Sequence, residues 1–232
     1  MNQLYYYDLS SLASGMLDRR CVNCPLKLEK LVTDMDAEYN LVANDGTIFT
    51  FHTNKNAPRY KVVRVDLNNP DVWSDVIPES ESDVLETVHC ANEKQLVVCY
   101  LRDVKYVLQV RDLESGVLLH SLPTDIGSIY NISGERKDKQ FFFSYTSFLT
   151  PAIVYRCDLE PLTPSIEVFR ESSVKDFDRT MFETQQVCFR NFQIGQEKIG
   201  ILELDMPFEC MASLNLSGLF FMMSQILPNA LW

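Results

Sequence analysis

The chain has 232 residues, of which 46% are hydrophobic and 23% are charged, a composition typical of folded globular proteins rather than disordered ones. This length suits one large domain or two small ones. The formal net charge is −11, and no basic run is longer than the mixed-sign stretch 135–139, which we interpret as a solvated hairpin tip. Because nucleic acid binding needs clustered Lys and Arg against the phosphates, we expect no nucleic acid partner.

The amino-terminal segment MNQLYYYDLS has no positively charged region followed by an apolar one, so it does not resemble a secretory signal. The seven cysteines are an odd number and are scattered along the chain. Most lie in apolar, strand-like segments such as LVVCYL at 96–101, where a free Cys acts as a small buried hydrophobe. We therefore expect a reducing compartment, the cytosol.

An Asp-Leu pair recurs along the chain, and the successive separations are 58, 46 and 46 residues. A fixed period in this range indicates a repeat architecture. The four pairs are Asp8-Leu9, Asp66-Leu67, Asp112-Leu113 and Asp158-Leu159.

Each of the last three pairs closes the third of four short segments rich in β-branched and aromatic residues, which predicts four strands in each unit. Gly, Asn, Asp and Pro turns separate these segments. In chain order the predicted strands are 4–9 and 27–32, then 37–44, 47–53, 60–67 and 72–78, then 84–91, 95–101, 106–113 and 117–123, and finally 127–133, 140–147, 152–159 and 165–171.

Turn chemistry supports these units. Asn44-Asp45-Gly46 predicts a hairpin between the first two strands of one unit, because Gly tolerates a positive φ. Glu114-Ser115-Gly116 predicts a turn between the third and fourth strands of the next unit. The repeated Asp is explained by the same chemistry, since its carboxylate accepts backbone N–H groups of the turn that follows. We therefore expect a turn-forming Asp rather than a catalytic acid.

Antiparallel four-stranded units of about 46 residues are typical of β-propeller blades. The sequence thus predicts an all-β fold, a partial β-propeller of about three and a half blades. Three blades are complete, and the outer half of another precedes them. Closed propellers have about four to eight blades, so we expect this chain to be part of one.

Several stretches closely resemble the propeller of the prolyl oligopeptidase (prolyl endopeptidase) family. The most distinctive are Thr-Asn-x-x-x-Pro-x-Tyr at Thr53–Tyr60 and Thr-Ser-Phe-Leu-Thr-Pro at 146–151. The resemblance covers roughly residues 2–187 and is weakest near 17–26. It implies a cytosolic serine endopeptidase that cleaves short peptides after proline. In that family a seven-bladed propeller caps the α/β-hydrolase domain of the same polypeptide and excludes large, folded substrates.

The resemblance carries no catalytic residue onto this chain. The family's nucleophile lies on a Gly-x-Ser-x-Gly elbow, which the sequence does not contain. From the resemblance we also expect the family's pocket-lining propeller residues to fall upstream of Met1. We therefore assign no catalytic, cofactor-binding or metal residue and no cofactor, and we expect the chain alone to be inactive. This suggests a fragment, a truncated isoform or a misjoined gene model of such a peptidase.

The resemblance also divides the chain, into a partial propeller at 1–187 and an unmatched C-terminal tail at 188–232. Residues 169–187 resemble the segment by which the family leaves the propeller. The family would continue with a Ser-Lys-Asp-Gly-type turn and a strand that opens the hydrolase domain, but 188–232 shows no such similarity. We expect this tail to be disordered or loosely collapsed. Polar residues and a proline interrupt its uncharged part, 210–232, which argues against a membrane span.

Two other candidate sites are weak. Cys21-x-x-Cys24 lacks the second pair that a zinc ribbon needs and the βαβ context of a thioredoxin-like motif. His52, His89 and His120 each lie in a predicted strand, and no Ser lies on a recognisable nucleophile elbow. We interpret all five as structural residues.

A different class of function remains open, since fold alone does not fix function. A non-enzymatic propeller that binds a partner protein would be stable and soluble, and its binding of that partner would be saturable. A piece of a peptidase would instead expose strand edges and apolar faces, and we would expect it to aggregate.

Overall fold

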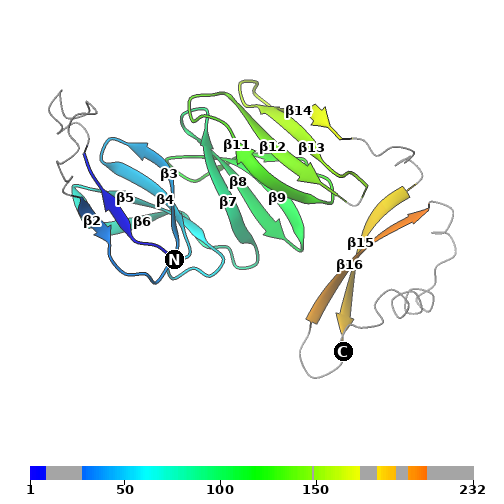
Figure 1. Ribbon diagram of the computed structural model, residues 1–232, viewed down its shortest axis with the longest axis horizontal. Coiled ribbons are helices and arrows are strands. Elements are labelled where there is room, and N and C mark those ends of the chain that lie inside the picture. Colours follow the sequence, from blue (N-terminus) through cyan, green and yellow to red (C-terminus); the bar gives the residue numbers. More distant parts are fainter. Residues whose placement is uncertain (9–27, 148, 173–181, 192–197, 208–232) are drawn as a thin grey trace, which may run out of the picture.

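The computed structural model describes residues 1–8, 28–147, 149–172, 182–191 and 198–207 (Figure 1). These residues form strands and turns, without a helix, and therefore contain no helix long and apolar enough to cross a membrane. For 182–191 and 198–207 the description is limited to the backbone.

Three four-stranded antiparallel sheets follow one another along the chain, and each keeps its strands in sequence order. We call them the first, second and third blade. The first blade holds β3 (Tyr39–Asp45), β4 (Ile48–Thr53), β5 (Lys61–Asp66) and β6 (Asn69–Ile77). The second blade holds β7 (Val84–Ala91), β8 (Gln95–Arg102), β9 (Lys105–Asp112) and β10 (Leu118–Leu122). The third blade holds β11 (Ser128–Ser133), β12 (Gln140–Thr146), β13 (Ile153–Asp158) and β14 (Ser165–Glu171).

A two-stranded sheet precedes the first blade. It pairs β1 (Leu4–Tyr6) with β2 (Glu29–Val32), and we call it the half-blade. The order of half-blade and three blades confirms the predicted all-β partial propeller of about three and a half blades.

Burial alternates along β12 because successive side chains of a strand point to opposite faces of the sheet. In β12 the side chains of Phe141, Phe143 and Tyr145 are buried, whereas Phe142 and Ser144 between them are partly exposed. The buried set points toward the second blade, where it joins Val97 and Leu108 in one apolar cluster.

Apolar clusters fill the two interfaces between the complete blades. Val62 and Ile77 of the first blade pack with Leu96, Val98 and Tyr100 of the second. A third cluster lies between the half-blade and the first blade, and includes Phe51, Val63 and Trp73. Because each cluster draws residues from two neighbouring sheets, each blade depends on its neighbours for a complete core.

The predicted turn role of the repeated Asp is confirmed in all three blades. Asp66 Oδ1 accepts the Asn68 N–H at 3.0 Å, and Asp158 Oδ1 accepts the Glu160 N–H at 2.8 Å. Asp112 Oδ1 accepts the Ser115 N–H at 2.7 Å and also the hydroxyl of that residue. These hydrogen bonds hold the turn between the third and fourth strands.

The Leu that follows each Asp has a matching role. In every blade its amide donates, at 2.8–2.9 Å, to the carbonyl of the residue just before the second strand, which is Thr47, Lys94 or Lys139. Leu113 and Leu159 are also buried. Asp-Leu thus ends the third strand, starts its turn and fastens that turn to the second strand.

Each blade also has a register shift between its first two strands. The shifts lie at Leu41/Ala43, Leu85/Thr87 and Tyr130/Ser133. Such bulges bend a strand and increase its twist. The repeat therefore extends to backbone irregularities that the sequence period did not reveal.

The described part of the tail differs from our expectation. β15 (Phe182–Asn191) pairs with β16 (Lys198–Pro207) in continuous antiparallel register, from Phe182↔Pro207 to Asn191↔Lys198. Residues 188–191 and 198–207 thus belong to strands. Strand propensity explains this, because the segments on both sides of 192–197 contain strand-forming residues such as Val187 and Ile201. The boundary predicted after residue 187 falls inside β15, and 208–232 lie outside the described residues.

Candidate functional site

The three histidines do not converge on one site. His89 and His120 lie in β7 and β10, the opposite edges of the second blade, and strands separated by two others are roughly 14 Å apart. His52 lies in the first blade, with its Nε2 2.9 Å from the Leu85 carbonyl oxygen. His89 is four residues further along the same strand as Leu85, which is about 13 Å.

His52 has a structural role at the boundary of the first two blades. Its ring stacks on Tyr60, with centroids 4.7 Å apart. Burial lowers the pKa of His52, so the ring is neutral at pH 7 and donates its Nε2 proton to the Leu85 carbonyl. His89 differs, because its buried Nε2 has no hydrogen-bond partner among the described residues.

Three of the cysteines are buried, unpaired and protonated. Cys90, Cys99 and Cys157 are free, and burial raises the pKa of Cys99 and of Cys157 to about 12. A thiol with so high a pKa is not a nucleophile at neutral pH. Cys21 and Cys24 lie outside the described residues. Within the described ranges, no three His, Cys, Asp or Glu side chains are grouped as metal ligands.

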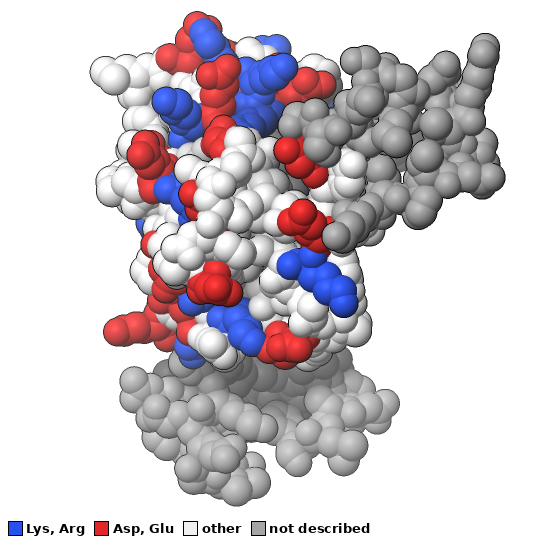
Figure 2. Space-filling model, turned by 90° about the vertical axis from the view of Figure 1, so that its left-hand side faces the viewer, with Lys and Arg blue, Asp and Glu red and all other residues white. Residues whose placement is uncertain are grey.

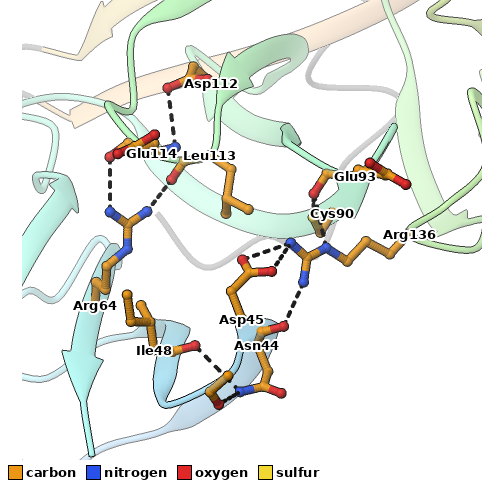
Figure 3. Close-up of polar contacts among 11 residues, drawn as sticks. Asn44, Asp45, Ile48, Arg64, Cys90, Glu93, Asp112, Leu113, Glu114 and Arg136 are labelled. Atoms are coloured by element: carbon orange, nitrogen blue, oxygen red, sulfur yellow. Dashed lines mark hydrogen bonds and ion pairs between the residues drawn. The ribbon is translucent and has the colours of Figure 1, made fainter. Parts of the chain in front are cut away.

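Two arginines cross between blades (Figure 3). Arg64 lies in β5 of the first blade and reaches the turn between β9 and β10 of the second. Its Nη1 donates to the Glu114 carbonyl at 3.2 Å, and its Nη2 donates to the Leu113 carbonyl. Arg64 thus satisfies the turn carbonyls that follow Asp112 in the next blade.

Arg136 connects three blades. It lies in the turn between β11 and β12, and its Nε donates to the Glu93 carbonyl of the second blade at 3.0 Å. Its Nη1 donates to the Asn44 carbonyl of the first blade at 2.7 Å, and its Nη2 lies 2.8 Å from both carboxylate oxygens of Asp45. The Asp45 carboxylate further raises the pKa of Arg136, which is a permanent cation in any case.

A small pocket lies between the half-blade and the first blade, and its volume is about 280 Å³. Lys61 at its edge pairs with Asp75 at 2.9 Å, and Lys55 pairs with Asp36. Because both lysines are already neutralised by a carboxylate, the pocket beside Trp73 is better suited to packing against a neighbouring segment than to catalysis. The lining residues are Val32, Tyr39, Thr53, Lys55, Asn56, Lys61, Val63, Trp73 and Asp75.

On the face seen from the half-blade side, Lys and Arg are interspersed with Asp and Glu (Figure 2). The visible charges do not form a basic patch there.

Neither crossing arginine was predicted from the sequence. Residues 135–139 do form a hairpin turn, but the side chain of Arg136 is only 29% exposed, so it is an interblade residue rather than a solvated one. A repeated sequence feature could have pointed to Arg64. An Arg stands two residues before the Asp-Leu pair both in Arg64-Val65-Asp66-Leu67 and in Arg156-Cys157-Asp158-Leu159. The sequence carries no equivalent signal for Arg136.

The comparisons with known proteins agree with this geometry. The sequence model of the prolyl oligopeptidase N-terminal beta-propeller domain matches residues 1–171. The dual-function macrocyclase-peptidase POPB of Galerina marginata is 33% identical over 178 residues, which are 75% of this chain and 24% of that protein. Prolyl oligopeptidase A of Amanita bisporigera is 31% identical over 169 residues, covering 72% of this chain and 22% of that protein.

Solved structures are similar as well. The apo structure of prolyl oligopeptidase B from Galerina marginata has a TM-score of 0.73 at 29% identity, over 88% of this chain and 28% of that one. The same enzyme bound to a 35mer hydrolysis and macrocyclization substrate has a TM-score of 0.67 at 28% identity, over 87% of this chain and 26% of that one. The chain thus spans about a quarter of the length of the relatives it matches.

Proposed function

The chain belongs to the prolyl oligopeptidase family, and on this premise we propose that it is the propeller part of a serine endopeptidase that cleaves peptides after proline. The propeller would control, by size, which peptides reach the α/β-hydrolase domain of the same polypeptide. The enzyme would act in the cytosol, which agrees with free Cys90, Cys99 and Cys157.

The observation that carries this proposal is the continuous wall formed by the three blades. Apolar clusters fill both interfaces between them, and Arg64 and Arg136 tie their turns together. Exclusion by size requires such a wall, because gaps between blades would admit folded substrates. The first strands of consecutive blades approach one another, β3 to β7 and β7 to β11, so they would line the inner side of the ring.

Peptides of tens of residues are the proposed substrate class. The relative from Galerina marginata has been solved with a 35mer and with a 25mer substrate, and a chain similar to its propeller would admit peptides of related length. The chain by itself would not cleave them, since its sequence holds no Gly-x-Ser-x-Gly nucleophile elbow.

An antibody raised against residues 82–123 tests the proposal. We expect it to precipitate from the source cells a protein far larger than 26.8 kDa that cleaves short fluorogenic peptides after proline and is labelled by an active-site serine reagent. Purified 232-residue chain should be neither active nor labelled. A stable product near 26.8 kDa, precipitated without activity and together with a second protein, would instead favour a non-enzymatic interaction module.

A further inference from the structure

We propose that Arg136 is a salt-sensitive latch that fastens the first-hairpin turns of three successive blades and sets how far the first and third blades spread apart. The turns are those between β3 and β4, between β7 and β8, and between β11 and β12. We call them the three latch turns.

The unusual feature is that Arg136 links blades that are not neighbours. The second blade lies between the first and the third, yet the guanidinium reaches past the Glu93 carbonyl to the Asn44 carbonyl and the Asp45 carboxylate (Figure 3). The apolar clusters act only between neighbouring blades. Arg136 is therefore placed to limit how far the first and third blades rotate apart across the two interfaces that separate them.

The neighbouring turns are already joined by backbone hydrogen bonds. The amide of Asn92 donates to the Asp138 carbonyl at 2.9 Å, and the amide of Glu93 donates to the Arg136 carbonyl at 2.7 Å. These two bonds hold the second and third latch turns together without any charge. The first latch turn is different, because its contacts with the third come from the Arg136 side chain.

Salt sensitivity follows from the exposure of the acidic partner. The side chain of Asp45 is 60% exposed and that of Arg136 is 29% exposed, so dissolved ions reach the pair. The Debye length falls from about 10 Å at 0.1 M salt to about 3 Å at 1 M salt, which weakens an exposed pair. Because the pair restrains non-neighbouring blades, its loss permits the first and third blades to separate.

The position of the latch turns suggests what the latch controls. They lie at the ends of β3, β7 and β11, the first strands that approach one another along the inner side of the blades. If the proposed gating function holds, on which this step rests, a released latch widens the inner opening at this end. Longer or bulkier peptides would then pass more readily.

The test is a distance measurement on the full 232-residue chain. Nitroxide labels are attached through p-acetylphenylalanine at Asn69 and at Lys137, because the native cysteines preclude thiol labelling. Both positions are exposed, and both lie at the latch end, in the first and in the third blade. Pulsed electron paramagnetic resonance then gives the distance at 0.05 M and at 1 M NaCl.

We expect the distance to shift to longer values at 1 M NaCl in the otherwise unmodified chain. Asp45→Asn should show the longer distance already at 0.05 M and no further change with salt. Arg136→Lys should behave similarly, because an ammonium group cannot reach the same three acceptors at once. Glu167→Gln is the matched control, since it removes an ion pair within one blade, Arg156–Glu167, whose carboxylate is as exposed as that of Asp45, and it should leave the distance unchanged.

Equal distances at both salt concentrations, with no effect of Asp45→Asn, would overturn the latch. A shift in Glu167→Gln as large as that in Asp45→Asn would also overturn it, because the cause would then be a general loss of surface charge pairing. Hydrogen exchange at the Asn92 and Glu93 amides should stay the same throughout, which shows that the fold is retained. None of these measurements needs peptidase activity, so failure of the latch and failure of the proposed function are distinguishable.

Discussion

At the scale of single residues, the fold depends most on the identity of the residues in its turns. The repeated Asp and Leu hold one turn in each blade by the same hydrogen bonds. The other turns rely on backbone conformation instead. Asp103 and Val104 form the two-residue link between β8 and β9, and both have positive φ, 47° and 62°.

Val104 is a poor residue for its position, and Val104→Gly should stabilise the fold. A positive φ in a β-branched residue costs about 1–2 kcal/mol, whereas Asp-Gly is favoured in such hairpins. Val104 is also exposed, so its side chain contributes little packing. We expect a net gain of about 1 kcal/mol in the free energy of unfolding by urea, allowing for the greater freedom of Gly in the unfolded chain.

Val117→Gly is the control for this change, because Val117 is equally exposed but has no positive φ. It should be neutral or destabilising. If both variants shift stability by the same amount, backbone strain at Val104 is not the cause.

From the turn Asp residues we expect the stability of the fold to depend on pH. Hydrogen bonds from the Ser115 hydroxyl and amide lower the pKa of Asp112, and backbone hydrogen bonds likewise lower the pKa of Asp66 and Asp158. A lowered pKa in the folded state means that the unfolded chain binds protons first as pH falls. The stabilisation is therefore complete above the unfolded pKa near 4 and is lost as pH drops toward the folded values.

Asp112→Asn should remove the Asp112 share of this dependence while keeping the turn, because Asn also accepts the turn amides. Between about pH 5 and pH 2.5, the free energy of unfolding should decline less steeply in the variant than in the wild type. Urea unfolding at a series of pH values measures both slopes. Identical slopes would mean that the Asp112 turn does not contribute to acid sensitivity.

At the scale of elements, the blades depend on close contacts between the turn of one and the strand of another. Gly116 lies in the turn between β9 and β10, with a φ of 70°, and a Cβ there would lie 2.0 Å from the Val76 carbonyl oxygen of β6. Both the positive φ and the approach to the first blade require glycine.

Gly116→Ala should therefore destabilise the interface between the first and second blades, by about 3 kcal/mol or more. Gly46→Ala is a matched control, because Gly46 has a similar φ of 62° but no atom within 4 Å of its Cβ position. It should cost only about 1 kcal/mol. Thermal and urea unfolding of the two variants compares these costs, and equal losses would show that the Val76 contact is unimportant.

The sequence predicted elements better than it predicted their connections. Strands such as Val84–Ala91 and Ser165–Glu171 were predicted with their observed bounds, because β-branched and aromatic runs end at clear turn residues. The register shift at Leu85/Thr87 was not predicted, because an extra residue leaves no compositional trace. Arg136 was missed for a similar reason, since its partners are mainly carbonyl groups, which every residue has.

At the scale of the whole molecule, repetition explains both the success and the limit of sequence reasoning. A period of 46 residues reveals blades because each blade repeats the same local chemistry. It does not reveal contacts that skip a blade, such as the one between Arg136 and Asp45. Nor did similarity to the family predict the pairing of β15 with β16, because hairpin formation depends on strand propensity rather than on shared motifs.

The outer face of the third blade leads to the last prediction. Phe169 in β14 is 61% exposed and packs edge-on against Phe142, with centroids 5.1 Å apart. Among the described residues, no further blade follows to cover this face. An uncovered apolar face beside an edge strand favours self-association. We therefore expect the isolated chain to associate as its concentration rises, and Phe169→Lys to shift this association to a severalfold higher concentration.

Leu162→Lys separates the effect of this face from that of charge. Leu162 is 94% exposed and lies in the turn between β13 and β14, so its substitution makes the same change in charge without altering the face. Sedimentation velocity over a range of concentrations should show suppressed association in Phe169→Lys and unchanged association in Leu162→Lys. If both variants suppress association equally, the face around Phe169 is not the cause, because the two substitutions make the same change in net charge.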